Sequence, residues 1–201
     1  LTAAQVEELY QSHIHDSSFE HMVQPKMVYI SNPTEYGTLY SRKELEELSR
    51  VCREHDLYLF MDGARLGYGL AAPDNELDLP FLAEHCDVFY IGGTKVGALF
   101  GEAVVIVNEE LKKDFRYFIK QKGGMLAKGR LLGIQFETLF EDDLYMEISR
   151  HAIRMAEKLR EAFREKGYPF LVENRTNQIF PVMPDSVLEK LSSSYGYSYQ
   201  E

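Results

Sequence analysis

The sequence predicts an α/β protein with a mainly parallel sheet, followed by the start of a smaller α+β domain. Between Lys26 and Val107, short apolar runs alternate with amphipathic segments, which favours parallel strands joined by helices. After about residue 145 the pattern changes to one long, charged, amphipathic segment and two further short apolar runs. We therefore assign residues 1–145 to part of a large domain and residues 146–201 to the beginning of a small C-terminal domain.

Each element follows from a local pattern of apolar residues and terminating residues. Thr2 is the expected N-cap of the first helix, and Ser41 with Glu44 forms a capping box at the start of the second. Residues 67–78 are expected to be irregular. The predicted elements are helices over 2–11, 41–55, 79–85, 109–119 and 125–166, large-domain strands over 26–31, 57–61, 87–91 and 103–107, and small-domain strands over 169–172 and 178–182.

Charge and composition exclude several classes of partner. The net charge of −10 argues against nucleic acid and against an anionic membrane surface, because both attract a basic face. No signal peptide or membrane span is visible, since the longest apolar stretch is interrupted by glycines, Lys95 and Glu102. The two cysteines, Cys52 and Cys86, are expected to be free structural thiols. We therefore expect a cytoplasmic protein.

Two charged residues stand at the ends of predicted strands. Asp62 follows the apolar run 57–61, and Lys95 lies in a glycine-rich loop between two apolar strands, where we expect its ammonium to be buried. Residues just past the carboxyl ends of parallel strands line a common crevice. An acid and a lysine placed in this way suit pyridoxal phosphate, because the lysine can bind it covalently and the carboxylate can keep its pyridine nitrogen protonated.

Four motifs, in their order and spacing, resemble those of the low-specificity threonine aldolases. These enzymes belong to the β-eliminating lyase group of pyridoxal-phosphate enzymes of fold type I, the aspartate aminotransferase fold. The motifs are NPTEYGT at 32–38, FMDGARL at 60–66, GGTKVG at 92–97 and KGGMLAKG at 122–129. The resemblance spans nearly the whole chain, and it implies the same fold and cofactor here.

The resemblance also implies roles for individual residues. Lys95 would bind the cofactor covalently, Asp62 would pair with the pyridine nitrogen, and Arg65 would hold the substrate carboxylate. Thr94 would donate to the cofactor phosphate, and Asn32 would present a polar group to the cofactor or the substrate. Glu35 stands where the family has a histidine, and it is the candidate base for the substrate hydroxyl.

The same residues also have simpler interpretations. Lys95 could be a surface lysine, Asp62 a turn cap and Arg65 one half of a surface ion pair. His13, His15 and His21 lack the cysteine or carboxylate partners of a metal site, so we expect no metal. The basic residues Lys120, Lys122, Lys128 and Arg130 either contact a phosphate across a dimer interface or remain solvated.

Three functions follow as hypotheses. The first is a lyase that cleaves threonine or allo-threonine to glycine and an aldehyde, acting as a homodimer or homotetramer on a small amino acid. The second is an aminotransferase or a β-eliminating lyase with the same cofactor. The third is a structural or binding homologue without cofactor. Because the chain starts at Leu1 and ends soon after a predicted helix, we expect a fragment that is inactive alone.

Overall fold

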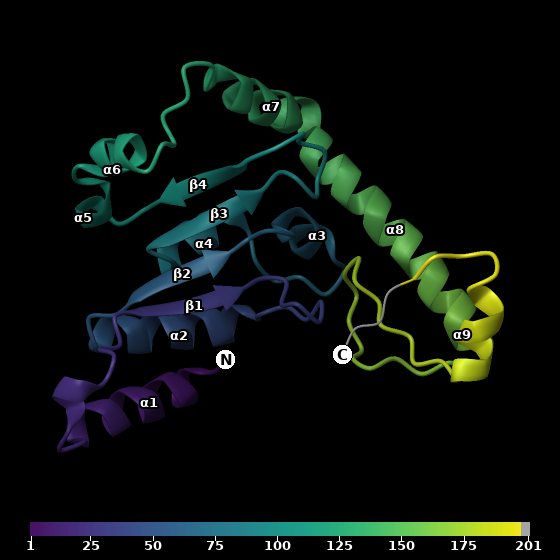
Figure 1. Ribbon diagram of the computed structural model, residues 1–201, viewed down its shortest axis with the longest axis horizontal. Coiled ribbons are helices and arrows are strands. Elements are labelled where there is room, and N and C mark those ends of the chain that lie inside the picture. Colours follow the sequence, from purple (N-terminus) through teal and green to yellow (C-terminus); the bar gives the residue numbers. More distant parts are fainter. Residues whose placement is uncertain (198–201) are drawn as a thin grey trace.

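The computed structural model describes residues 1–197 and is built around one sheet (Figure 1). Within these residues the sheet has four strands in the order β1-β2-β3-β4, which are Met27–Ser31, Tyr58–Asp62, Val88–Gly92 and Glu102–Ile106. β1, β2 and β3 are parallel, and β4 is antiparallel to β3. The predicted mainly parallel sheet is therefore confirmed. The carboxyl ends of β1, β2 and β3 lie along one edge.

Helices form where the sequence provides caps and an apolar stripe. Thr2 and Ser41 each accept from the backbone of the third helical residue, so both predicted capping boxes are present. Residues 67–78 are only partly irregular, because α3 occupies their first part. The helices are α1 (Ala3–His15), η1 (Phe19–His21), α2 (Arg42–Glu54), α3 (Leu66–Ala71), α4 (Leu79–His85), α5 (Glu109–Lys112), α6 (Phe115–Gln121), α7 (Arg130–Phe140), η2 (Glu141–Asp143), α8 (Leu144–Glu165) and α9 (Asp185–Leu191).

The two faces of the sheet differ sharply. One face is buried, and its side chains join Leu45 and Leu48 of α2, Leu66 of α3 and Leu82 of α4 in one core. The strand residues on that face are Val28, Ile30, Leu59, Met61, Phe89 and Ile91. On the other face, Tyr29 and Val104 are about half exposed, at 51% and 55%. Helices among the described residues therefore cover mainly one face.

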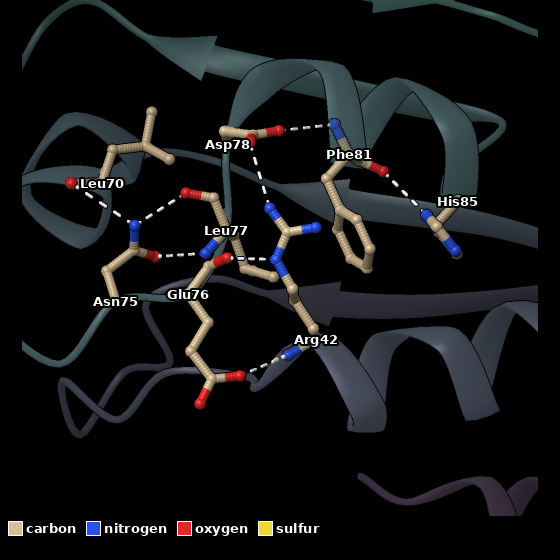
Figure 2. Close-up of polar contacts among 8 residues, drawn as sticks. All are labelled: Arg42, Leu70, Asn75, Glu76, Leu77, Asp78, Phe81 and His85. Atoms are coloured by element: carbon tan, nitrogen blue, oxygen red, sulfur yellow. Dashed lines mark hydrogen bonds and ion pairs between the residues drawn. The ribbon is translucent and has the colours of Figure 1, made fainter.

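The segment between α3 and α4 is held by specific polar contacts (Figure 2). The Asn75 amide bonds to the backbone of Leu77 in both directions, at 2.7 and 3.1 Å. Arg42 Nε donates to the Glu76 carbonyl at 2.7 Å, and its guanidinium lies 4.4 Å from the centre of the Phe81 ring. Asp78 accepts from the Phe81 N–H and starts α4. The loop thus joins α2 to α4.

The long helical prediction over 125–166 was wrong in its detail. α7 and α8 are separate helices, because Asp142 and Asp143 have φ values of 49° and 61°. Such left-handed conformations interrupt an α-helix, and aspartate tolerates them better than most residues. Asp114, with φ of 56°, similarly separates α5 from α6 within the predicted helix 109–119.

The two predicted strands of the small domain were also wrong. Residues 169–172 and 178–182 meet only in an isolated antiparallel bridge between Phe170 and Pro181. Two backbone bonds, Leu171 N–H to Phe180 and Val182 N–H to Pro169, support this bridge. Pro169 carries no N–H donor, so its pair with Val182 lacks the return hydrogen bond of a regular ladder.

Helix α8 connects the sheet to the segment that follows it (Figure 1). Its start contacts α3, and its later part carries Arg160, which is 2% exposed and donates to the Thr176 carbonyl at 2.9 Å. Apolar and aromatic side chains between Leu159 and Tyr197 line a cavity of about 790 Å³. The predicted boundary near residue 145 falls at the start of α8 and stays a prediction.

None of the described helices has the length and apolar character that crossing a membrane requires.

Candidate functional site

The turns after β2 and β3 are in direct backbone contact. The Gly92 N–H donates to the Gly63 carbonyl at 2.9 Å. A Cβ atom on Gly63 would lie 1.8 Å from the Tyr90 carbonyl oxygen, and one on Gly92 would lie 2.3 Å from that of Ala64. Only glycine permits this approach at either position. It brings the residue before Gly63, Asp62, next to the loop that carries Lys95.

Asp62 is an ionised carboxylate with its orientation fixed. Its Oδ1 accepts from the Ala64 N–H at 2.9 Å, and its Oδ2 accepts from the Tyr29 hydroxyl. Burial raises the pKa of Asp62, but hydrogen bonds from Tyr29, Tyr90 and Ala64, together with the positive charge of Lys95, lower it by more. The pKa of Asp62 is therefore below its usual value. The structure thus places Lys95 and Asp62 close enough for their charges to interact.

Lys95 is exposed, so the expected burial of its ammonium was wrong. The apolar residues around it do not enclose it: Val96 is buried, but Leu99 and Phe100 point largely to solvent, at 87% and 45% exposure. The backbone is held instead, because the Tyr68 hydroxyl donates to the Lys95 carbonyl. The backbone of the loop is therefore anchored, while the Lys95 side chain is exposed.

Thr94 and Asn32 make contacts within the protein. The Thr94 hydroxyl donates to Glu102 Oε1 at 3.0 Å, and the same carboxylate accepts from the Gly93 N–H. Asn32 is fully buried, and its Oδ1 accepts from the Tyr40 N–H at 3.1 Å. Its Nδ2 has no partner among the described residues. The predicted cofactor contacts of Thr94 and Asn32 remain predictions.

Glu35 and Arg65 lie together at the same edge of the sheet. Arg65 Nη1 is 3.5 Å from Glu35 Oε2, and the Arg65 side chain is 23% exposed while that of Glu35 is 72% exposed. The loop carrying Glu35 is held from the far end of the chain, because Gln178 Nε2 donates to the Glu35 carbonyl at 2.8 Å. The predicted substrate-binding arginine and the predicted base are thus adjacent.

Comparison with known proteins identifies the family. Residues 2–186 match the β-eliminating lyase family. The chain belongs to the β-eliminating lyases. It is 33% identical over 173 residues to the low-specificity L-threonine aldolase of Pseudomonas aeruginosa, covering 85% of this chain and 50% of that protein. The chain therefore spans about half the length of the curated relatives that it matches.

Solved structures agree with this placement. A threonine aldolase from Leishmania major superposes with a TM-score of 0.92 at 45% identity, over 98% of this chain and 56% of that one. The pyridoxal-phosphate-bound C-S lyase of Staphylococcus hominis superposes at 0.63 with 16% identity, over 92% of this chain and 46% of that one, and so supports the fold alone. The predicted fold class, fold type I, is confirmed.

Several residues that support the site in this β-eliminating lyase were not singled out from the sequence. Tyr29, Tyr90 and Glu102 hold Asp62 and the lysine loop. Tyr145 accepts from the Gly67 N–H at 3.1 Å and donates to the Gly92 carbonyl at 2.9 Å, so it joins the two turns. One signal was available for Tyr29: it stands two residues before Ser31, the register partner of Asp62. Tyr145 carried no such signal.

The donor set fits the cofactor that the sequence predicts. Pyridoxal phosphate requires an amine to bind it and an anion beside its ring nitrogen. Lys95 offers an exposed amine, and Asp62 offers a carboxylate that is already ionised and oriented. Among residues 1–197, no group of three or more His, Cys, Asp and Glu side chains could hold a metal ion.

Proposed function

We propose that this chain forms part of a pyridoxal-phosphate-dependent lyase that cleaves β-hydroxy amino acids, such as threonine or allo-threonine, to glycine and an aldehyde. The observation that carries the proposal is the contact between the turns of Asp62 and Lys95, with Arg65 and Glu35 beside them. The named activity of the relatives from Pseudomonas and Leishmania supports the same reaction.

The residues divide the work as follows. Lys95 would hold the cofactor, and Asp62 would keep a proton on its ring nitrogen. A cofactor held in this way would supply an acceptor for the electrons of the substrate's Cα–Cβ bond. Arg65 binds the carboxylate of the amino acid and orients the substrate. Glu35 takes the proton from the substrate hydroxyl as the aldehyde leaves.

The ion pair between Glu35 and Arg65 suggests that carboxylate binding by Arg65 precedes proton removal by Glu35. A substrate carboxylate that binds Arg65 competes with Glu35 for the same guanidinium. The displaced Glu35 is then no longer held by the guanidinium and can turn toward the substrate hydroxyl. The base is thus released when the substrate arrives.

We also propose that the protein acts as a homodimer or homotetramer in the cytoplasm. Among soluble oligomers, closed symmetric assemblies of identical chains are the commonest, dimers first and tetramers next. The two cysteines, Cys52 and Cys86, are free and buried, which supports a reducing compartment.

The test uses the intact protein, purified and loaded with pyridoxal phosphate. We expect a visible absorbance band from the bound cofactor, and acetaldehyde and glycine in equal amounts from threonine or allo-threonine. A keto acid as the main product would favour an aminotransferase. Absence of any cofactor band after loading would overturn the proposal. Light scattering of the same sample measures the oligomeric state.

A further inference from the structure

Tyr29 contacts the carboxylate of Asp62 from the neighbouring strand. In the parallel register Tyr29 pairs with Phe60 and Ser31 pairs with Asp62, so Tyr29 and Asp62 lie on the same face of the sheet. The Tyr29 hydroxyl donates to Oδ2, while the Ala64 N–H donates to Oδ1. The two donors therefore hold different oxygens of one carboxylate.

Packing of the ring determines where the Tyr29 hydroxyl lies. The ring stacks on Phe60 with centroids 5.4 Å apart and an interplanar angle of 9°. Phe60 in turn packs against Tyr90 of β3, with the two ring centroids 6.1 Å apart. Stacking on Phe60 restricts the rotation of the Tyr29 ring, and this keeps the hydroxyl in contact with Asp62.

The charges around this pair keep it in one protonation state. The hydrogen bond to Asp62 raises the pKa of Tyr29 to about 12, so the hydroxyl remains a donor at neutral pH. Lys95 is the positive group acting on Asp62, while Glu35 acts on Tyr29 and Glu102 acts on Tyr90. Asp62 thus remains the anion, with neutral hydroxyls beside it.

We propose that Tyr29 is a positioning residue, which orients the Asp62 carboxylate toward the ring nitrogen of the cofactor. A carboxylate has about four acceptor positions. Tyr29 occupies one on Oδ2 and Ala64 one on Oδ1, and Tyr90 also bonds to this carboxylate. The positions left open then have a fixed direction in which a ring N–H can be accepted. This inference rests on the proposed function for its catalytic part only, since the contact itself is independent of it.

The first experiment measures Asp62 directly in the cofactor-free intact protein. Tyr29→Phe removes the hydroxyl and keeps the ring that stacks on Phe60. Carbon-13 NMR of labelled aspartate, titrated with pH, should show a higher pKa for Asp62 in this variant than in the native protein. Tyr58→Phe is the matched control. Tyr58 lies on β2, on the same face of the sheet as Tyr29 and Asp62, but its ring lies against Lys26 and not against Asp62. An unchanged Asp62 titration in Tyr29→Phe would overturn the proposal.

The second experiment measures the cofactor-loaded protein. We expect kcat in Tyr29→Phe to fall about 10-fold, the scale of one hydrogen bond, with little change in the KM for the amino acid. The unfolding transition of Tyr29→Phe should be only slightly lower than that of Tyr58→Phe, because one hydrogen bond to an ionised carboxylate is lost. Unchanged kcat together with a shifted Asp62 titration would show that Tyr29 does not position the acid for the reaction. If the native protein has no turnover, the proposed function fails, while the titration still tests the contact.

Discussion

The turns after β2 and β3 present their reactive groups in opposite ways. The Asp62 side chain is held by Tyr29 and Ala64. In Lys95 only the backbone is held, and among residues 1–197 its ammonium forms no hydrogen bond or ion pair. In the proposed function the acid would work through a fixed charge, whereas the amine would have to form and exchange a covalent bond. A site of this kind needs rigidity at the first group and freedom at the second.

Removing the free group should have the largest effect. Lys95→Ala eliminates the only proposed covalent attachment, so turnover should fall to background, below that of any Asp62 variant. Borohydride reduction of the native loaded protein, followed by peptide mapping, should find the pyridoxyl group on Lys95. Its presence on another lysine would refute the assignment.

Neutralising the fixed group should have the next largest effect. Asp62→Asn keeps the shape and removes the charge that holds the ring nitrogen protonated. We expect turnover to fall about 10³-fold, equivalent to about 4 kcal/mol, with part of the cofactor still bound through Lys95. Turnover and cofactor content are measured together. Near-normal turnover would mean that Asp62 is only a turn cap.

Separating the two turns should affect stability as well as activity. Gly63→Ala places a methyl group 1.8 Å from the Tyr90 carbonyl oxygen, so we expect a loss of about 3 kcal/mol in the free energy of unfolding. Gly133→Ala in α7 is the control, because within residues 1–197 no atom beyond its chain neighbours and the nearby helix backbone lies within 4 Å of the added Cβ. It should stabilise the helix by up to about 1 kcal/mol. Equal stability of both variants would contradict the close contact.

The smallest expected effect concerns pH. The pKa of Asp62 is lowered in the folded protein, so its contribution to stability is present above the unfolded-state pKa of about 4. This contribution is lost as the pH falls through the folded-state value. Asp62→Asn should therefore flatten the acid side of the stability curve, which urea unfolding at pH 3 to 6 measures. Lys95→Ala should change stability at acid pH less than Asp62→Asn does. The charge of Lys95 is the smallest of the causes that shift the pKa of Asp62.

The sequence alone predicted the four strands of the large domain and the positions of Asp62 and Lys95 beside their ends, because apolar runs and the residues that end them are local signals. It failed where a conformation depends on single residues, as at Asp142 and Asp143, or on a missing donor, as at Pro169. It also missed contacts between distant segments. Tyr145 reaches Gly67 and Gly92 from 78 and 53 residues away, and no local pattern reveals such a bond.

The backbone contact between Gly63 and Gly92 has a consequence for how this protein can change. The approach of the two turns requires two positions that lack side chains. A Cβ at either position would meet a backbone carbonyl oxygen, which cannot move aside as the end of a flexible side chain can. We therefore expect neither position to tolerate substitution, even where the substituted residue is as small as alanine.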